Sequence, residues 1–141
     1  MKSLLIAVLA LALNASGGVV TVERINETIQ RESGGNPHAI GRNGEVGLGQ
    51  LKPGAVRDLR DEYEWTVTPG DRRNAKLNRI MTEGYLVLTE RRLRERLGRQ
   101  PTWREVEAAY IKGVDGFFKD FRQGIVGVTG RGAPRIGLKG T

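Results

Sequence analysis

The sequence predicts a mainly α-helical fold in a single domain, and three observations lead to this prediction. Apolar residues recur at the three- and four-residue spacing of helices in several segments. No segment alternates apolar and polar residues for long enough to build a sheet. The chain of 141 residues has room for one core, and its 38% hydrophobic and 28% charged residues exclude a disordered chain and a polytopic membrane protein.

Residues 1–17 have the layout of a secretory signal or of a segment that associates with a membrane. Lys2 precedes an apolar run from Leu4 to Leu13, and small residues follow as far as Gly17. The run has ten residues, whereas a membrane-spanning helix needs roughly 20. Two alternatives stay open: a buried first helix of the fold, and a retained segment that holds the protein transiently at a membrane.

The first helix of the domain is expected over residues 19–32, because its apolar residues are Val19, Val22, Ile25 and Ile29. Gly34 is well placed as its left-handed C-terminal cap, and Asn36-Pro37 reinforces the break. Residues 34–46 form a loop rich in glycine and asparagine. The next segment, 47–61, reads either as one helix or as a turn followed by a helix that restarts at Pro53.

The second half of the chain predicts one long helix and two short ones. After a connector over 63–70, Asp71 is expected to cap a helix that runs to Leu97 and ends at Gly98. Thr102 and Glu105 have the spacing of a capping box for a helix that Gly113 closes, and residues 114–121 give one more short helix. Residues 124–141 carry three basic residues and no acid, and we expect a mostly unpacked tail.

Cysteine, histidine and charge limit the possible chemistry. The chain has no cysteine, which excludes a disulfide framework, a Cys-ligated zinc site and a thiol nucleophile. A histidine-based metal cluster or catalytic triad would depend on His38 alone, and a hydrogen-bonded loop role is the expected one for His38. The net charge of +7 favours a polyanion: nucleic acid, anionic lipid or an acidic cell-wall polymer.

Five arginines crowd the end of the long helix, where positive charge complements the helix dipole. We interpret them as a solvated helix face in preference to a dedicated binding patch. They are Arg91, Arg92, Arg94, Arg96 and Arg99.

Glu32 is the strongest candidate for a catalytic residue. It lies at the predicted C-terminal end of the first helix, where the negative end of the helix dipole disfavours an ionised carboxylate. A protonated carboxylic acid is the group that a glycosidase uses to protonate a leaving oxygen. The glycines that follow would let a bulky polymer approach the backbone, and Gln50 could bind a sugar hydroxyl or acetamido group. On these grounds alone, an ordinary helix-end glutamate stays the more frequent explanation.

This stretch resembles the soluble lytic transglycosylase family, the lysozyme-like enzymes that act on bacterial peptidoglycan. The family pattern Glu-Ser-x-x-Asn-Pro, followed by a loop ending in Gly-x-x-Gly-Leu-x-Gln, is matched without a gap by Glu32, Ser33, Asn36, Pro37, Gly44, Gly47, Leu48 and Gln50. Weaker matches follow in order at Asn78 with Tyr85-Leu86, and at Ala108-Ala109-Tyr110 with Gly113. The resemblance covers about residues 20–120 and implies a lysozyme-like (SLT or goose-type lysozyme-like) single domain over 18–123 with a Gly-rich active-site loop.

The chain departs from the family pattern at four positions. Ile111 replaces the asparagine expected after Tyr110, and Thr82 replaces a glycine four residues after Asn78. Gly41 stands where a small or polar residue is common, and Glu45 where the family often has a small apolar residue. The change at Ile111 affects a substrate hydrogen bond or a helix-terminating contact, but it leaves the acid in place.

The resemblance implies a peptidoglycan lytic transglycosylase that cleaves the MurNAc-β-1,4-GlcNAc bond with Glu32 alone and forms a 1,6-anhydro-muramyl product. The implied reaction needs no metal and no cofactor, which agrees with the absence of cysteine and the single histidine. Ser33, Gln50, Tyr110, Glu45 and Tyr85 are the implied substrate-site residues: Gln50 and Tyr110 orient the glycan, and Tyr85 supports packing near the acid. If Glu45 lies opposite Glu32, it could activate water and make the enzyme a hydrolytic muramidase. A surface charge is the plainer reading of Glu45. Core or rim packing is the expected role of Trp65 and Trp103, and sugar stacking is the alternative.

Peptidoglycan glycan strands are the expected partner, and the expected location is the bacterial periplasm, the cell envelope or a phage virion. A phage virion and a secretion or conjugation machinery are both compatible hosts. A wall-binding assembly component without turnover, favoured by Ile111, and a basic nucleic-acid binder are the alternatives. The export segment and the Glu-Ser motif argue against nucleic acid.

Overall fold

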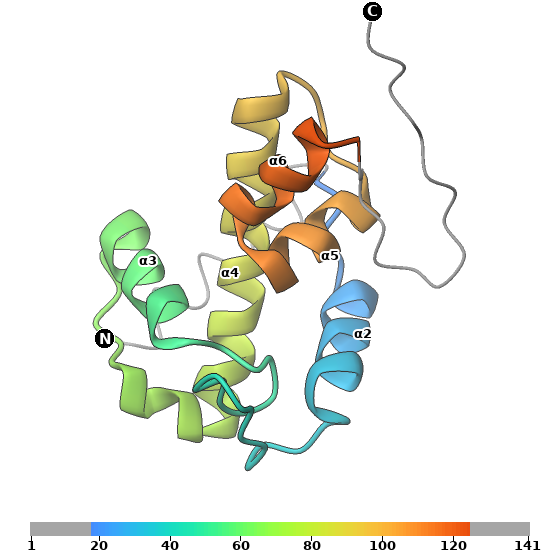
Figure 1. The fold of residues 1–141 in the computed structure, drawn as a ribbon. Coiled ribbons are helices and arrows are strands. Elements are labelled where there is room, and N and C mark those ends of the chain that lie inside the picture. The colour runs from blue at the N-terminus through green and yellow to red at the C-terminus, as the bar shows by residue number, and fades with distance from the viewer. Residues whose placement is uncertain (1–17, 125–141) are drawn as a thin grey trace, which may run out of the picture. The chain divides into compact units, whose positions relative to one another are not determined.

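The computed structural model describes residues 18–124, and both the predicted signal over 1–17 and the predicted tail beyond Gly124 lie outside them. The described residues fold into helices, as predicted, and β pairing among them is limited to the isolated bridges Ile40–Val46 and Val46–Leu51. No helix in this part of the chain is long and apolar enough to cross a membrane. The elements are α2 (Val22–Ser33), α3 (Pro53–Tyr63), the 3-10 helix η1 (Pro69–Arg73), α4 (Ala75–Leu97), α5 (Trp103–Lys112) and α6 (Val114–Arg122) (Figure 1).

The chain divides into two compact units between Leu88 and Thr89, which is a point inside α4. The first unit holds α2, α3, η1 and the first part of α4. The second holds the rest of α4 with α5 and α6, and α5 packs against α6. Each unit therefore has its own set of buried apolar side chains. These include Ile25, Val56, Leu59, Met81 and Leu86 in the first, and Leu93, Val106, Ala109 and Phe117 in the second.

Both ends of α2 follow from local sequence signals. The helix begins three residues later than the apolar spacing predicts, because the Thr21 side chain accepts a hydrogen bond from the backbone N–H of Arg24 (3.3 Å) and caps it. At the other end Gly34 has a left-handed backbone (φ 62°) and donates its N–H to the Gln30 carbonyl oxygen (2.9 Å). The predicted glycine cap is thus confirmed, and it ends α2 directly after Glu32 and Ser33.

The structure selects the second of the two readings of residues 47–61, since α3 begins at Pro53, where a missing N–H costs nothing. The expected role of Asp71 was wrong. Its carboxylate accepts a hydrogen bond from the Thr68 N–H (2.8 Å) in a capping box that starts η1, and α4 begins only at Ala75. Asn74 then accepts the Leu77 N–H (3.0 Å) in the first turn of α4.

Trp65 packs against α4 in the first unit, in agreement with the packing role expected for it. It is 8% exposed, and a Cβ added at Gly84 would lie 2.5 Å from its Cη2 atom. Glycine at position 84 therefore leaves the room that the indole occupies. At its far end α4 stops at Gly98 (φ 69°), whose N–H donates to the Arg94 carbonyl (3.0 Å), as predicted.

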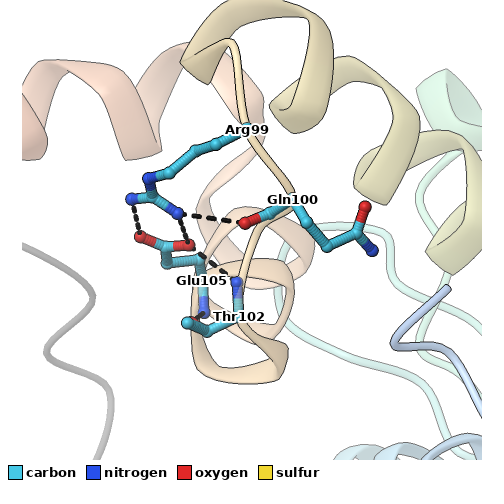
Figure 2. Close-up of polar contacts among 4 residues, drawn as sticks. All are labelled: Arg99, Gln100, Thr102 and Glu105. Atoms are coloured by element: carbon cyan, nitrogen blue, oxygen red, sulfur yellow. Dashed lines mark hydrogen bonds and ion pairs between the residues drawn. The ribbon is translucent and has the colours of Figure 1, made fainter.

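The capping box of α5 is confirmed and is reinforced by an ion pair (Figure 2). Thr102 Oγ1 accepts the Glu105 N–H (3.2 Å), and Glu105 Oε2 accepts the Thr102 N–H (2.8 Å). Arg99 then binds both carboxylate oxygens, with Nη2 2.7 Å from Oε1 and Nη1 3.0 Å from Oε2. Two-point binding of this kind is the strongest form of Arg–carboxylate contact, so it fixes the turn between α4 and α5.

Other arginines at the end of α4 also have partners, and Arg94 and Arg96 stay exposed, in agreement with the solvated face expected for them. Arg96 lies 4.0 Å above the ring of Phe118 and 2.7 Å from an Asp115 oxygen, and both of these residues belong to α6. Arg94 lies 3.7 Å from Glu90. The predicted short helix over 114–121 is present as α6, and its aromatic side chains pack on one another at 5.2–6.0 Å.

Acid should weaken the Arg99–Glu105 pair in a defined direction. Burial alone would raise the pKa of Glu105, but hydrogen bonds from Arg99 and Thr102 outweigh it and hold the pKa below its ordinary value of 4.5. A lowered pKa means that the carboxylate stabilises the fold above about pH 4.5 and that this contribution is lost as the pH falls further. Glu105→Gln should therefore unfold more easily than the wild type at about pH 6, with the difference shrinking at about pH 3.

Chemical denaturation at both pH values measures this difference. Glu95→Gln is the control, because the Glu95 side chain is 65% exposed and its contact with Arg91 is long (3.9 Å). A gap between Glu105→Gln and wild type that stays constant with pH would contradict the assigned direction.

Candidate functional site

Glu32 lies one residue before the end of α2, and its side chain is 21% exposed. Arg31 reaches one of its two carboxylate oxygens: Nε and Nη2 both lie 3.1 Å from Oε1. Neighbouring residues on a helix normally point in different directions, so this contact depends on the long arginine side chain folding back at the end of the helix. No sequence signal indicates this role of Arg31.

Ser33 is the last residue of α2 and is half-buried. Its hydroxyl donates to the Ile29 carbonyl oxygen (3.1 Å), one turn earlier in the same helix. The hydroxyl proton is therefore used inside the helix, and the hydroxyl oxygen is the part of Ser33 that can accept a further hydrogen bond.

The loop after α2 folds back on itself twice. The Gly41 N–H donates to the Glu45 carbonyl (2.8 Å), and Val46 and Leu51 exchange two backbone hydrogen bonds (3.1 and 3.2 Å). Gln50 has a left-handed backbone (φ 49°) at the second reversal, and its side-chain amide donates to the carbonyls of Ala39 (3.1 Å) and Gly47 (2.9 Å). The Gln50 amide nitrogen thus holds the loop together, a role that the sequence did not indicate.

Asn78 joins this loop to α4. Its side chain is fully buried, and its Nδ2 donates to the carbonyls of Val46 (2.9 Å) and Arg72 (2.8 Å) while its Oδ1 accepts the Gly49 N–H (3.0 Å). The Asn78 amide therefore forms hydrogen bonds with three separate backbone groups, two through its N–H protons and one through its oxygen. The sequence pattern included Asn78 but assigned it no role.

Two loop glycines are required because α4 comes so close. A Cβ at Gly47 would lie 2.3 Å from Asn78 Nδ2, and a Cβ at Gly49 would lie 1.9 Å from Thr82 Oγ1. The glycines at these two positions therefore admit side chains of α4, whereas the sequence suggested that they admit the substrate. The Thr82 hydroxyl donates to the Asn78 carbonyl (2.8 Å) and lies 3.2 Å from Asn78 Oδ1.

Arg72 of η1 binds the other side of the loop. Its Nη1 donates to the carbonyls of Gly44 (2.8 Å) and Leu51 (2.7 Å), and its Nε donates to the Pro69 carbonyl (2.7 Å). Burial, assisted by the neighbouring charge of Arg73, lowers the pKa of Arg72. The guanidinium stays charged at neutral pH, so it anchors both arms of the loop electrostatically.

Glu45 is bound within its own loop. Its Oε2 accepts the Asn43 N–H (2.8 Å), and its Oε1 lies 3.8 Å from Lys52 Nζ. Hydrogen bonds from its own backbone N–H and from Asn43, with the charge of Lys52, hold the pKa of Glu45 below its usual range. The side chain lies over Gly41, where a Cβ would be 2.2 Å from Oε2, so Gly41 makes room for this turn.

The two predicted tyrosines belong to different units. Tyr85 is half-buried on α4 in the first unit, and Tyr110 is 9% exposed on α5 in the second. Ile111, which replaces the family asparagine, is 47% exposed on α5. Glu83 on α4 is a further half-buried carboxyl group that the sequence did not single out. Burial raises its pKa, and the charge of Arg79 opposes the rise.

Within residues 18–124, no group of three or more acidic or histidine side chains is arranged to hold a metal ion. His38 is an exposed loop residue whose backbone N–H donates to Asn36 Oδ1 (2.9 Å), which is a local turn contact. The site as described therefore offers carboxyl, hydroxyl and amide groups from α2 and the following loop.

Comparison with known proteins gives one match. Residues 18–123 match the family model described as the transglycosylase SLT domain. No curated protein matches the chain significantly. No solved structure does so either.

Removing the Asn78 amide should loosen the loop. Asn78→Ala leaves the Val46 and Arg72 carbonyls and the Gly49 N–H without their partner, so the free energy of unfolding should fall by roughly 2–4 kcal/mol. Denaturant titration followed by circular dichroism measures the loss. Asn26→Ala is the control, because Asn26 is exposed and accepts a hydrogen bond from the Arg79 guanidinium (2.6 Å) at the surface. Equal losses in the two variants would contradict the role given to Asn78.

Proposed function

We propose that this chain, a member of the transglycosylase SLT domain family, is a lytic transglycosylase. In this proposal it cleaves the MurNAc-β-1,4-GlcNAc bond of peptidoglycan. Family membership supports peptidoglycan cleavage in general. The bond that is cleaved and the product that forms are proposed from the role of Glu32. The main supporting observation is the position of this carboxyl group at the end of α2, directly before the loop that Asn78 and Arg72 hold in place.

In the proposed reaction Glu32 acts twice. Its carboxyl group first gives a proton to the glycosidic oxygen, the bond from this oxygen to the anomeric carbon breaks, and the GlcNAc side leaves with a new hydroxyl group. The Glu32 carboxylate then takes the proton of the muramyl 6-hydroxyl while that oxygen attacks the anomeric carbon. This closes a 1,6-anhydro ring and restores the acid, so no water is consumed and no metal or cofactor enters the balance.

The Arg31 contact assigns the two carboxylate oxygens to different tasks. Arg31 binds Oε1, so the proposal gives the proton transfer to Oε2. Holding one oxygen also fixes the plane of the carboxyl group, and a fixed orientation is what proton transfer to a bound glycan requires.

The other predicted residues have supporting parts in this proposal. Ser33 and Gln50 present their oxygen atoms to the glycan. The family resemblance implies that Tyr110 orients the glycan and that Tyr85 supports packing near the acid. Because the Glu45 carboxylate is engaged by Asn43 and Lys52, its contacts favour a loop role over activation of water. This favours the transglycosylase over the hydrolytic muramidase. We further propose export to the bacterial envelope or a phage virion, with a secretion or conjugation machinery as an alternative host.

Replacing the acid tests the activity itself. Glu32→Gln keeps the shape of the side chain but cannot deliver the proton, so the rate of turbidity loss of purified cell walls should fall on the order of 10³-fold. Glu27→Gln, on the same helix and exposed, should leave the rate unchanged. Unchanged helicity in both variants is checked by circular dichroism.

Two results of that experiment would reject the proposal. Full activity of Glu32→Gln would exclude this residue as the acid. Wall binding by the wild type without any release of muropeptides would identify a non-catalytic assembly component.

The product identifies the reaction. Mass spectrometry of the released muropeptides should show 1,6-anhydro ends, which weigh one water less than reducing ends. Glu45→Gln should give the same ends, because the second step uses the muramyl hydroxyl and not water. Reducing ends from the wild type that disappear in Glu45→Gln would instead establish a hydrolase in which Glu45 activates water.

A further inference from the structure

The charges of the first unit are unevenly placed. Residues 18–88 contain ten basic and ten acidic residues, so this part of the chain is formally neutral. Residues 41–52 and 69–76, however, contain five basic residues against Glu45 and Asp71 only. The five are Arg42, Lys52, Arg72, Arg73 and Lys76. We call the four around Arg72, namely Arg42, Lys52, Arg73 and Lys76, the loop–η1 patch.

Hydrogen bonds bring these two segments together. Arg72 binds the carbonyls of Gly44 and Leu51, which are near neighbours in sequence of Arg42 and Lys52. Asn78 binds the carbonyls of Val46 and Arg72 with one amide nitrogen. The loop, η1 and the start of α4 are thus joined at four carbonyls, and their positive charges share one region of the first unit.

The two nearby acids, Glu45 and Asp71, offset only part of the charge of the five basic residues. The Asp71 carboxylate caps η1 through the Thr68 N–H, and Glu45 binds Asn43 and lies 3.8 Å from Lys52. Arg72 donates hydrogen bonds to backbone carbonyls and not to carboxylates. The charge of Arg73 is among the causes that lower the pKa of Arg72.

All four members of the patch are exposed to solvent. Arg42, Arg73 and Lys76 are exposed and make no ion pair with any residue of the described chain. Five positive charges against two engaged carboxylates, in a unit that is otherwise acidic, form a local field that attracts anions.

We propose that the loop–η1 patch binds the carboxylates of the short peptides attached to the glycan strand, so that the protein prefers peptide-bearing strands with free acid groups. This inference rests on the proposed function, in which the same loop faces the substrate. Hydroxyl and acetamido groups of the glycan carry no charge, whereas its peptides end in carboxylates. Arginine binds carboxylates at two points and lysine as a point charge, so a patch of both tolerates variable peptide positions.

The test combines a change in the protein with a change in the substrate. The patch variant is Arg42→Gln/Arg73→Gln/Lys76→Gln. The control variant, Arg57→Gln/Arg60→Gln/Lys119→Gln, removes the same charge from exposed positions on α3 and α6. Each protein is assayed on peptide-bearing glycan strands and on the same strands after carbodiimide in excess ammonia has converted their carboxylates to amides.

For the wild type and the control variant, kcat/KM on native strands should exceed that on amidated strands by about tenfold, a size typical of several exposed charge contacts. In the patch variant this ratio should fall to near one. A ratio that is the same in the patch and control variants would overturn the proposal. A second result would also overturn it: a lower kcat/KM of the patch variant that persists on amidated strands and disappears once wall-linked phosphate polymers are removed. That result would assign the patch to those polymers.

A binding measurement separates this inference from the proposed function. If the wild type cleaves neither substrate, the proposed function fails. Calorimetry with the native protein then compares soluble peptide-bearing muropeptides with their amidated forms. Tighter binding of the acidic form, lost in the patch variant, supports the patch; equal binding of both forms overturns it.

Discussion

The amide of Asn78 is the interaction on which the first unit depends. In a buried position it satisfies the backbone of Val46 and Gly49 in the loop and of Arg72 in η1. Buried backbone groups without partners cost about 1–3 kcal/mol each, so one side chain removes three such costs together. The loop after Glu32 therefore owes its shape to α4, a helix that begins 43 residues further along the chain.

The same contact explains why the loop is rich in glycine and how the chain accommodates Thr82. Gly47 and Gly49 have no Cβ because Asn78 and Thr82 occupy that space. Thr82 stands where the family pattern has glycine, and its hydroxyl is 1.9 Å from the position that a Cβ of Gly49 would take. The larger side chain of Thr82 on α4 thus fits because Gly49 in the loop has no side chain.

Positive charge serves different purposes in the two units. In the second unit Arg96 and Arg99 are paired with Asp115 and Glu105, and they hold α5 and α6 to the end of α4. In the first unit Arg72 donates three hydrogen bonds to backbone carbonyls, while the arginine and lysine side chains around it remain exposed. Similar residue types therefore stabilise the second unit and leave an excess of positive charge around Arg72 in the first unit.

The sequence by itself determined the helical class, the ends of the helices at Gly34 and Gly98, the capping box at Thr102 and the position of Glu32. These features depend on residues at most a few positions apart, which a sequence displays directly. The tertiary structure decided that Gln50 and Asn78 brace the loop, that Asp71 caps η1 and that Arg72 joins η1 to Gly44. Except for the Asp71 cap and the contact of Gln50 with Gly47, these contacts join backbone carbonyls to side chains that reach them only after the chain has folded. Carbonyls are present at every residue, so no sequence pattern marks which of them a distant amide or guanidinium will bind.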